Sequence, residues 1–142
     1  CRLYPLLPVF AETGAIVGID SRFGIYDELE AIDGTARACQ INALPLEYVQ
    51  PFFDLALAIA SEPILLFYAL VYQRGKSHVA QRVAAAAAHA SCSAFRAFET
   101  ALVRNRLFDP TTLRAELVAI ADAFEARYGD RFRLEAGDVT GG

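Results

Sequence analysis

Apolar residues recur every three to four positions along most of the second half of the chain. This spacing is typical of helices that bury one face, and it predicts helices over about 50–60, 63–74, 77–106 and 110–128. The segments that join these helices are short, which favours antiparallel neighbours in space. We therefore expect an all-α fold, mainly a compact bundle of four to five helices, in a single domain that spans 1–142.

Local start and stop signals suggest where these helices begin and end. Ser61 before Pro63 is a good helix start, because serine caps a helix and proline is tolerated in the first turn. Pro51 also fits a first turn better than a helix interior, so the regular helix is expected to begin near Gln50. The other signals are the stop at Gly75, the cap Ser77, the start at Asp109-Pro110 and the stop at Gly129.

The two ends of the chain have weaker patterns. Residues 1–14 contain two prolines and a glycine among apolar residues, which predicts an extended arm laid over a hydrophobic surface. Residues 136–142 are rich in glycine and predict a flexible tail.

Two structures are possible between the arm and residue 34. Segments 15–19 and 22–26 could pair as a minor β-hairpin that turns at Asp20-Ser21. The slightly favoured alternative is a helix from about residue 23 to Ile32, which the Asp33-Gly34 pair would end.

The predicted helix 77–106 has two opposite faces. The apolar face consists of Val79, Val83, Ala87, Ala90, Ala94, Phe98 and Ala101. The polar face consists of His78, Arg82, His89, Cys92, Ser93 and Arg96. The first face predicts a packed interior that a second helix can approach closely, because most of its side chains are small. The second face predicts either a solvated stripe or a functional surface.

Composition and charge narrow the class of protein. The chain is 55% hydrophobic with a net charge of -4, which argues against disorder and against a protein that binds nucleic acid. Basic residues concentrate in 76–106 and acidic residues in the N-terminal third, which indicates pairing within the molecule or between subunits. Segment 49–72 is strongly apolar, but Asp54 and Glu62 interrupt it, so we expect two consecutive core helices and no membrane span.

Cysteine usage favours a cytoplasmic, intracellular protein. Cys1, Cys39 and Cys92 are an odd number at wide spacing, which fits neither a disulfide framework nor a zinc site. We expect no metal and no cofactor. The alternative is a lipoprotein anchored through Cys1, but the bulky apolar residues that follow do not resemble a flexible tether.

Weak candidates for chemistry lie on the polar face of the predicted helix 77–106. His89 and Cys92 are three residues apart and could touch, as a thiol nucleophile or half of a metal site requires, although a small buried cysteine is the more usual interpretation. Arg82 could pair with an acid such as Asp54 or Glu62. Arg96 could pair with Glu99 at helical spacing. The functional alternative for Arg82 and Arg96 is a groove that binds anions.

We therefore expect a non-catalytic binding or assembly module that acts through protein–protein contacts, either with itself or with a partner. The chain has more apolar surface than a small bundle needs, and it carries no high-specificity catalytic motif. Tyr68, Tyr72 and Phe98 are the candidate contact residues. The alternative is a site for a small apolar or anionic ligand, either enzymatic or purely binding, with Arg82 and His89 among its polar groups.

Overall fold

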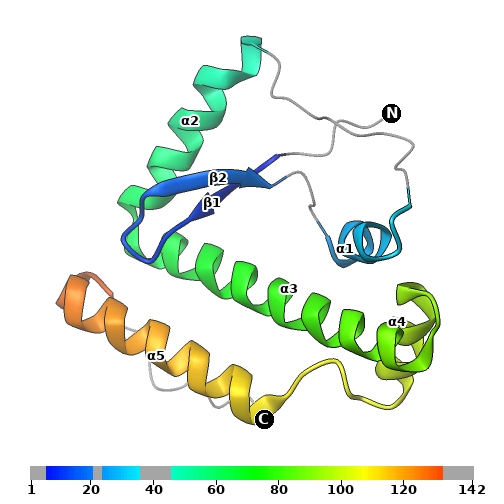
Figure 1. Cartoon of the computed structure of the whole chain (residues 1–142). Coiled ribbons are helices and arrows are strands. Elements are labelled where there is room, and N and C mark those ends of the chain that lie inside the picture. The colour runs from blue at the N-terminus through cyan, green and yellow to red at the C-terminus, as the bar shows by residue number, and fades with distance from the viewer. Residues whose placement is uncertain (1–5, 21–23, 36–45, 133–142) are drawn as a thin grey trace.

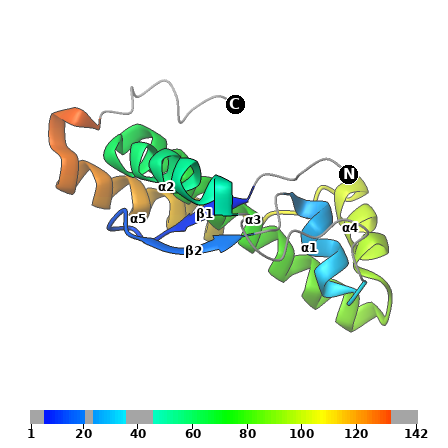
Figure 2. The same cartoon turned by 90° about the horizontal axis from the view of Figure 1, so that it is seen from above.

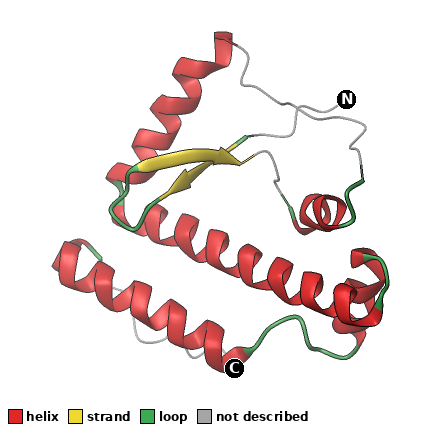
Figure 3. Ribbon diagram, viewed as in Figure 1, coloured by secondary structure: helices red, strands yellow, loops and turns green. Residues whose placement is uncertain are grey.

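The computed structural model describes residues 6–20, 24–35 and 46–132 (Figure 1). The elements are β1 (Leu7–Phe10), β2 (Ile16–Asp20), α1 (Ile25–Ile32), α2 (Leu46–Ser61), α3 (Pro63–Ala90), α4 (Ala94–Val103), α5 (Pro110–Tyr128) and a 3-10 turn (Gly129–Arg131). Helices dominate this part of the chain and a small antiparallel sheet completes it (Figure 3), so the predicted mainly α-helical fold is confirmed.

Helix α3 is the central element of the molecule. Its 28 residues extend about 42 Å, and the other elements pack along it (Figures 1 and 2). Helix α5 runs beside α3, α2 leaves the start of α3 at an angle of 105°, and α1 and α4 pack near its C-terminal end. The bundle is therefore organised around one long helix with a different set of neighbours at each end.

Two separate clusters of buried side chains lie along α3. The first joins the start of α3 to β1, α2 and α5, and consists of Phe10, Ala56, Leu66, Phe67, Leu70, Ile120, Phe124 and Phe132. The second joins the end of α3 to α1 and α4, and consists of Leu29, Val79, Val83, Ala87, Ala94 and Ala97. The predicted apolar face is thus confirmed in part. Its members Val79, Val83, Ala87 and Ala94 are buried and Phe98 and Ala101 are half-buried, whereas Ala90 is exposed.

The structure corrects the predicted boundaries of α3. The helix continues without interruption through Gly75 and Ser77, where a stop and a new cap were predicted. It breaks instead after Ala90, because Ser91 adopts a left-handed conformation with φ of 49° and the Cys92 N–H bonds the Ala87 carbonyl. The predicted helix 77–106 is therefore two elements, the end of α3 and α4. Packing on both sides of α3 outweighs the glycine penalty of about 1 kcal/mol.

Helix α2 also differs from its prediction. It begins at Leu46, so Pro51 lies inside the helix and removes one backbone hydrogen bond. Ser61 is the last residue of α2 and not the cap of α3, whose N-cap is Glu62. Asp109 as N-cap and Gly129 at the end of α5 are both confirmed.

The hairpin forms from different segments than predicted. β1, which lies within the expected N-terminal arm, pairs with β2 in the register Leu7↔Asp20 and Phe10↔Ile16. Gly14 supports the turn with φ of +85°, and a Cβ there would lie 3.2 Å from Leu66 Cδ2. The favoured alternative for the following segment is confirmed, since α1 is helical. The predicted tail 136–142, Cys1 and Cys39 lie outside the described residues.

Within the described ranges, no single helix is long and apolar enough to cross a membrane. Helices α2 and α3 reach that length and apolar character only when they are taken together, and a bend of 105° separates them.

Candidate functional site

The most unusual surface of the molecule lies on the first three turns of α3. Ile64, Leu65, Tyr68 and Tyr72 are 37–58% exposed and lie within an arc of about 100° on the side of α3 opposite Leu66 and Leu70. We call these four residues the α3 stripe. Large apolar side chains are normally exposed singly, so four together on one face make the α3 stripe a candidate contact surface.

The same side of α3 is covered further along the helix. Val79 and Val83 continue the stripe, but they are buried beneath α1 and α4 in the second cluster. The apolar side of α3 is therefore half covered by its own chain and half open. Between the two halves lies an apolar groove of about 420 Å³, lined by Ile25, Tyr72, Gly75, Lys76, Val79, Phe98, Leu107 and Phe108.

Gly75 lies where the stripe enters this apolar groove. No atom lies within 4 Å of the position that a Cβ would occupy. A glycine inside a helix is unfavourable, and here it supports no turn and relieves no internal contact. It does lower the floor of the groove, which would let another backbone approach α3.

Helix α2 adds further exposed apolar surface at the same end of the molecule. Only Ala56 of its sixteen residues is buried, whereas Leu46, Leu55 and Leu57 are 60–89% exposed. The expectation of two core helices is thus wrong for α2. Its apolar side spans about 200° of the helix circumference, and its own chain covers about half of that.

A second groove lies between the C-terminal half of α3 and α4. It has a volume of about 560 Å³ and is lined by Arg82, Val83, Ala85, Ala86, His89, Ala90, Cys92, Ala97, Thr100, Ala101, Arg104, Arg106 and Leu107. We call it the basic groove, because three arginines and a histidine line it and no aspartate or glutamate does.

The end of α4 positions two of the arginines in the basic groove. Arg104 and Arg106 flank Asn105, which is left-handed with φ of 51°. The Arg106 N–H bonds the Ala101 carbonyl at 2.7 Å and the Asn105 N–H bonds the Leu102 carbonyl at 3.0 Å, which together form a Schellman motif. The sequence prediction missed both arginines, because it continued the helix to residue 106. The asparagine between them was the available signal for a helix end.

The predicted polar face of helix 77–106 divides into separate groups. Arg82, His89 and Cys92 line the basic groove, as the alternative hypothesis required, but Arg96 does not. His78 turns toward α5, where its Nε2 accepts the Asp109 N–H at 3.2 Å and its ring stacks near Phe108.

The ion pairs suggested for the arginines do not form among the described residues. Arg82 Nε donates to the Arg106 carbonyl at 3.4 Å, while Asp54 accepts a hydrogen bond from Gln50 at 2.7 Å. No salt bridge joins Arg96 to Glu99 in the part of the chain that the structure describes. His89 and Cys92 share the groove, but the break after Ala90 removes the helical spacing that would bring them together.

The predicted pairing of acidic and basic segments is confirmed at Lys76, the only lysine of the chain. Its ammonium group contacts the carboxylates of Asp20 and Glu28, the latter at 3.3 Å. All three side chains are 10–17% exposed, so this charged cluster is largely buried where β2, α1 and α3 meet. It is a structural ion cluster that ties the N-terminal elements to α3.

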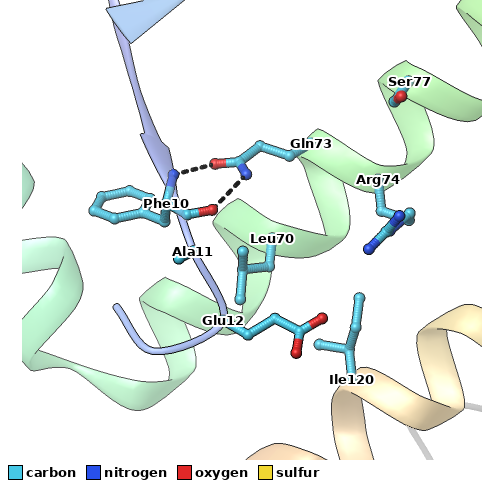
Figure 4. Close-up of a pocket in the computed structure, with 8 residues that line it drawn as sticks. All are labelled: Phe10, Ala11, Glu12, Leu70, Gln73, Arg74, Ser77 and Ile120. Carbon is cyan, nitrogen blue, oxygen red and sulfur yellow. Dashed lines mark hydrogen bonds between the residues drawn. The ribbon is translucent and has the colours of Figure 1, made fainter. Parts of the chain in front are cut away.

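A smaller pocket of about 350 Å³ lies between the hairpin turn, α3 and α5 (Figure 4). In Figure 4, Glu12 and Arg74 extend from the hairpin and from α3 on either side of Ile120. Arg74 also pairs with Glu116 at 3.6 Å. With one acid and one base, this pocket has no net charge that would select a ligand. No group of three potential metal ligands occurs among the described residues.

Searches of protein-family models, of curated proteins and of solved structures found no match to this chain.

Proposed function

We propose that this protein is a helical assembly module that forms a symmetric homodimer through the α3 stripe. The observation that carries the proposal is the interrupted coverage of α3. The chain buries the apolar side of α3 at Val79 and Val83 and leaves the same side exposed at Leu65 and Tyr68. A second helix laid on the stripe would complete the coverage.

The charge pattern favours a second copy of the chain as that helix. Between Glu62 and Arg74, residues 63–73 contain no charged side chain. In a two-fold contact each patch faces itself, so a charged patch would place like charges opposite one another. The uncharged stripe avoids this repulsion, and an antiparallel pair of α3 helices also aligns their dipoles favourably.

The residue types are those of subunit interfaces. Tyrosine is enriched at interface centres, because its ring buries a large apolar area while its hydroxyl can still reach water at the edge. Leu65 and Ile64 would supply aliphatic contacts, each worth about 1.5–3 kcal/mol when fully buried. Helix α2 ends one residue before α3 begins, and its exposed apolar side would add area toward the roughly 800 Å² per subunit of a stable interface.

Substitution of the stripe tests this proposal. Tyr68→Lys and Leu65→Lys place a charge at the centre of the contact, and sedimentation velocity should show a dimer converted to a monomer. Val118→Lys is the matched control, because Val118 is 44% exposed on α5, away from the stripe. Circular dichroism verifies that each variant keeps its helix content.

Two outcomes would reject a dimer formed through the α3 stripe. One is that the stripe variants and Val118→Lys sediment alike. The other is that the unsubstituted protein is monomeric throughout, in which case the open surface serves some other contact.

A further inference from the structure

We infer that the basic groove is a binding site for a small organic phosphate, which is a phosphate monoester joined to an apolar group. This site is separate from the proposed dimer contact, because none of the four residues of the α3 stripe lines it. The inference rests on the charge of the groove, on the order of its arginines and on the nature of its floor.

The charge of the groove is positive, because its lining contains three arginines and no aspartate or glutamate. Arg82, Arg104 and Arg106 line one depression, and within the described residues no salt bridge pairs any of them with an acid. Glu99 lies about 100° around α4 from Thr100, away from the groove. The Asp109 carboxylate caps α5 by accepting the N–H groups of its first turn, and it also interacts electrostatically with Arg82, so the positive charge of the groove rests mainly on Arg104 and Arg106. An anion in the groove would remove the mutual repulsion of the three arginines.

Backbone hydrogen bonds position the segment that carries two of the three arginines. The Schellman motif around Asn105 fixes the backbone of Arg104 and Arg106, and the Arg82 side chain is tied to the same turn through its bond to the Arg106 carbonyl. Because Arg82 uses Nε for that bond, its two terminal amino groups remain available to an anion in the groove that Arg82 lines. Guanidinium groups match phosphate in shape as well as charge, since each offers parallel N–H donors to two oxygens.

The floor of the groove is apolar and has small side chains. Ala86, Ala97 and Ala101 form it together with Val83 and Leu107, and the alanines leave space for a ligand group. The volume of about 560 Å³ lies within the usual range of small-molecule sites, roughly 300–1,000 Å³. A ligand that fills it would carry an apolar part for the alanine floor as well as an anion for the arginines. His89 and Thr100 are the remaining polar groups at its wall.

Titration calorimetry with phenyl phosphate and with inorganic phosphate tests the site. Phenyl phosphate should bind saturably and more tightly than inorganic phosphate. The double substitution Arg104→Gln/Arg106→Gln should weaken the binding about tenfold or more. Arg96→Gln is the matched control, because Arg96 is exposed on α4 but does not line the groove.

A substitution in the floor of the groove tests the contribution of the apolar floor separately from that of the arginines. Ala86 is exposed, so Ala86→Leu can fill the groove without disturbing the core. It should remove the advantage of phenyl phosphate over inorganic phosphate and leave the affinity for inorganic phosphate unchanged. Tyr68→Lys should bind phenyl phosphate normally, so failure of the dimer proposal would not be mistaken for failure of this one.

Vesicles distinguish a soluble phosphate ester from a lipid phosphate. If the ligand is a lipid, the protein should co-sediment with vesicles that contain phosphatidic acid but not with vesicles of phosphatidylcholine alone. The double arginine variant should co-sediment with neither. The inference is overturned if neither phenyl phosphate nor phosphatidic acid binds saturably. It is equally overturned if the double variant and Arg96→Gln retain the same binding.

Discussion

The side-chain amide of Gln73 makes with Phe10 the two hydrogen bonds that a neighbouring strand would make. The Phe10 N–H donates to Gln73 Oε1 at 3.0 Å, and Gln73 Nε2 donates to the Phe10 carbonyl at 3.1 Å (Figure 4). Phe10 itself is 4% exposed in the first cluster. One glutamine of α3 thus satisfies the open edge of β1 and holds the hairpin against the core.

Replacing this amide should weaken the attachment of the hairpin. Gln73→Leu keeps the size of the side chain but leaves a partly buried N–H and carbonyl without partners, so the free energy of unfolding should fall by about 1–3 kcal/mol. Chemical denaturation measures this change. Gln81→Leu is the control, because Gln81 is exposed on the same helix and should change stability by less than about 0.5 kcal/mol. Equal effects of the two substitutions would mean that the amide does not anchor the strand.

The ion cluster at Lys76 should be far more sensitive than a surface pair. Lys76→Met removes the cation that contacts the largely buried carboxylates of Asp20 and Glu28, which should cost about 3–5 kcal/mol. The control Arg74→Met breaks the half-exposed contact with Glu116 and should cost about 0–1 kcal/mol. Adding Glu28→Gln to Lys76→Met should restore part of the stability. A loss no greater than that of Arg74→Met would contradict a structural role for the cluster.

Gly75 should affect monomer stability and dimer affinity in opposite directions. Gly75→Ala should stabilise the monomer by about 0.5–1 kcal/mol, because alanine favours the helix and its methyl group meets no atom within 4 Å. The same methyl group would obstruct a partner helix in the apolar groove, so the dimer should dissociate about tenfold more readily.

Denaturation of the monomer and sedimentation equilibrium measure these two effects of Gly75→Ala. Ser77→Ala is the control, since it also raises helix propensity on α3 but lies on the opposite side from the stripe. A Gly75→Ala protein that is more stable and dimerises as well as the wild type would show that no backbone approaches α3 here.

The cap of α5 should make stability depend on pH in the acid range. Hydrogen bonds from the Thr112 side chain and backbone, followed by a smaller one from Thr111, hold the pKa of Asp109 below its ordinary value of 3.8. A carboxyl whose pKa is lowered by folding stabilises the protein above the unfolded value, and this stability is lost as the pH falls through the folded value.

Thermal unfolding of Asp109→Ala measures this pH dependence. The variant should unfold at a lower temperature than the wild type at about pH 7, and the difference should narrow below pH 3.8. Asp109→Asn should lose less than Asp109→Ala, because asparagine can still cap the helix. A difference that stays the same down to about pH 3 would exclude the ionised cap as its source.

The sequence was informative where a local signal and the packing agree. Asp109 before Pro110 gave the start of α5, and the spacing of Ile25, Leu29 and Ile32 gave α1, because each signal coincides with a buried face. At Gly75 and Ser77 the local signals were misleading. Two clusters on either side of α3 hold the helix together there, and no single window of sequence contains both of them.

The candidate site was predicted in part for the same reason. Arg82, His89 and Cys92 follow from the helical pattern. Arg82 and His89 lie in the C-terminal half of α3, and Cys92 follows shortly after the helix ends. Arg104 and Arg106 do not follow from that pattern, because the reversal of the chain at Ser91 folds α4 back along α3. That reversal depends on a left-handed serine, which has no strong sequence preference for this conformation. The hairpin partner of β2 was missed because the register is fixed by contacts with α3, remote in the sequence.

Light scattering coupled to size-exclusion chromatography, over a concentration series of the unsubstituted protein, measures whether the protein forms a homodimer. A homodimer built on the α3 stripe predicts a mass near twice the chain mass of 15.5 kDa at high concentration, falling toward the monomer on dilution. A constant mass near 15.5 kDa at every concentration would contradict it.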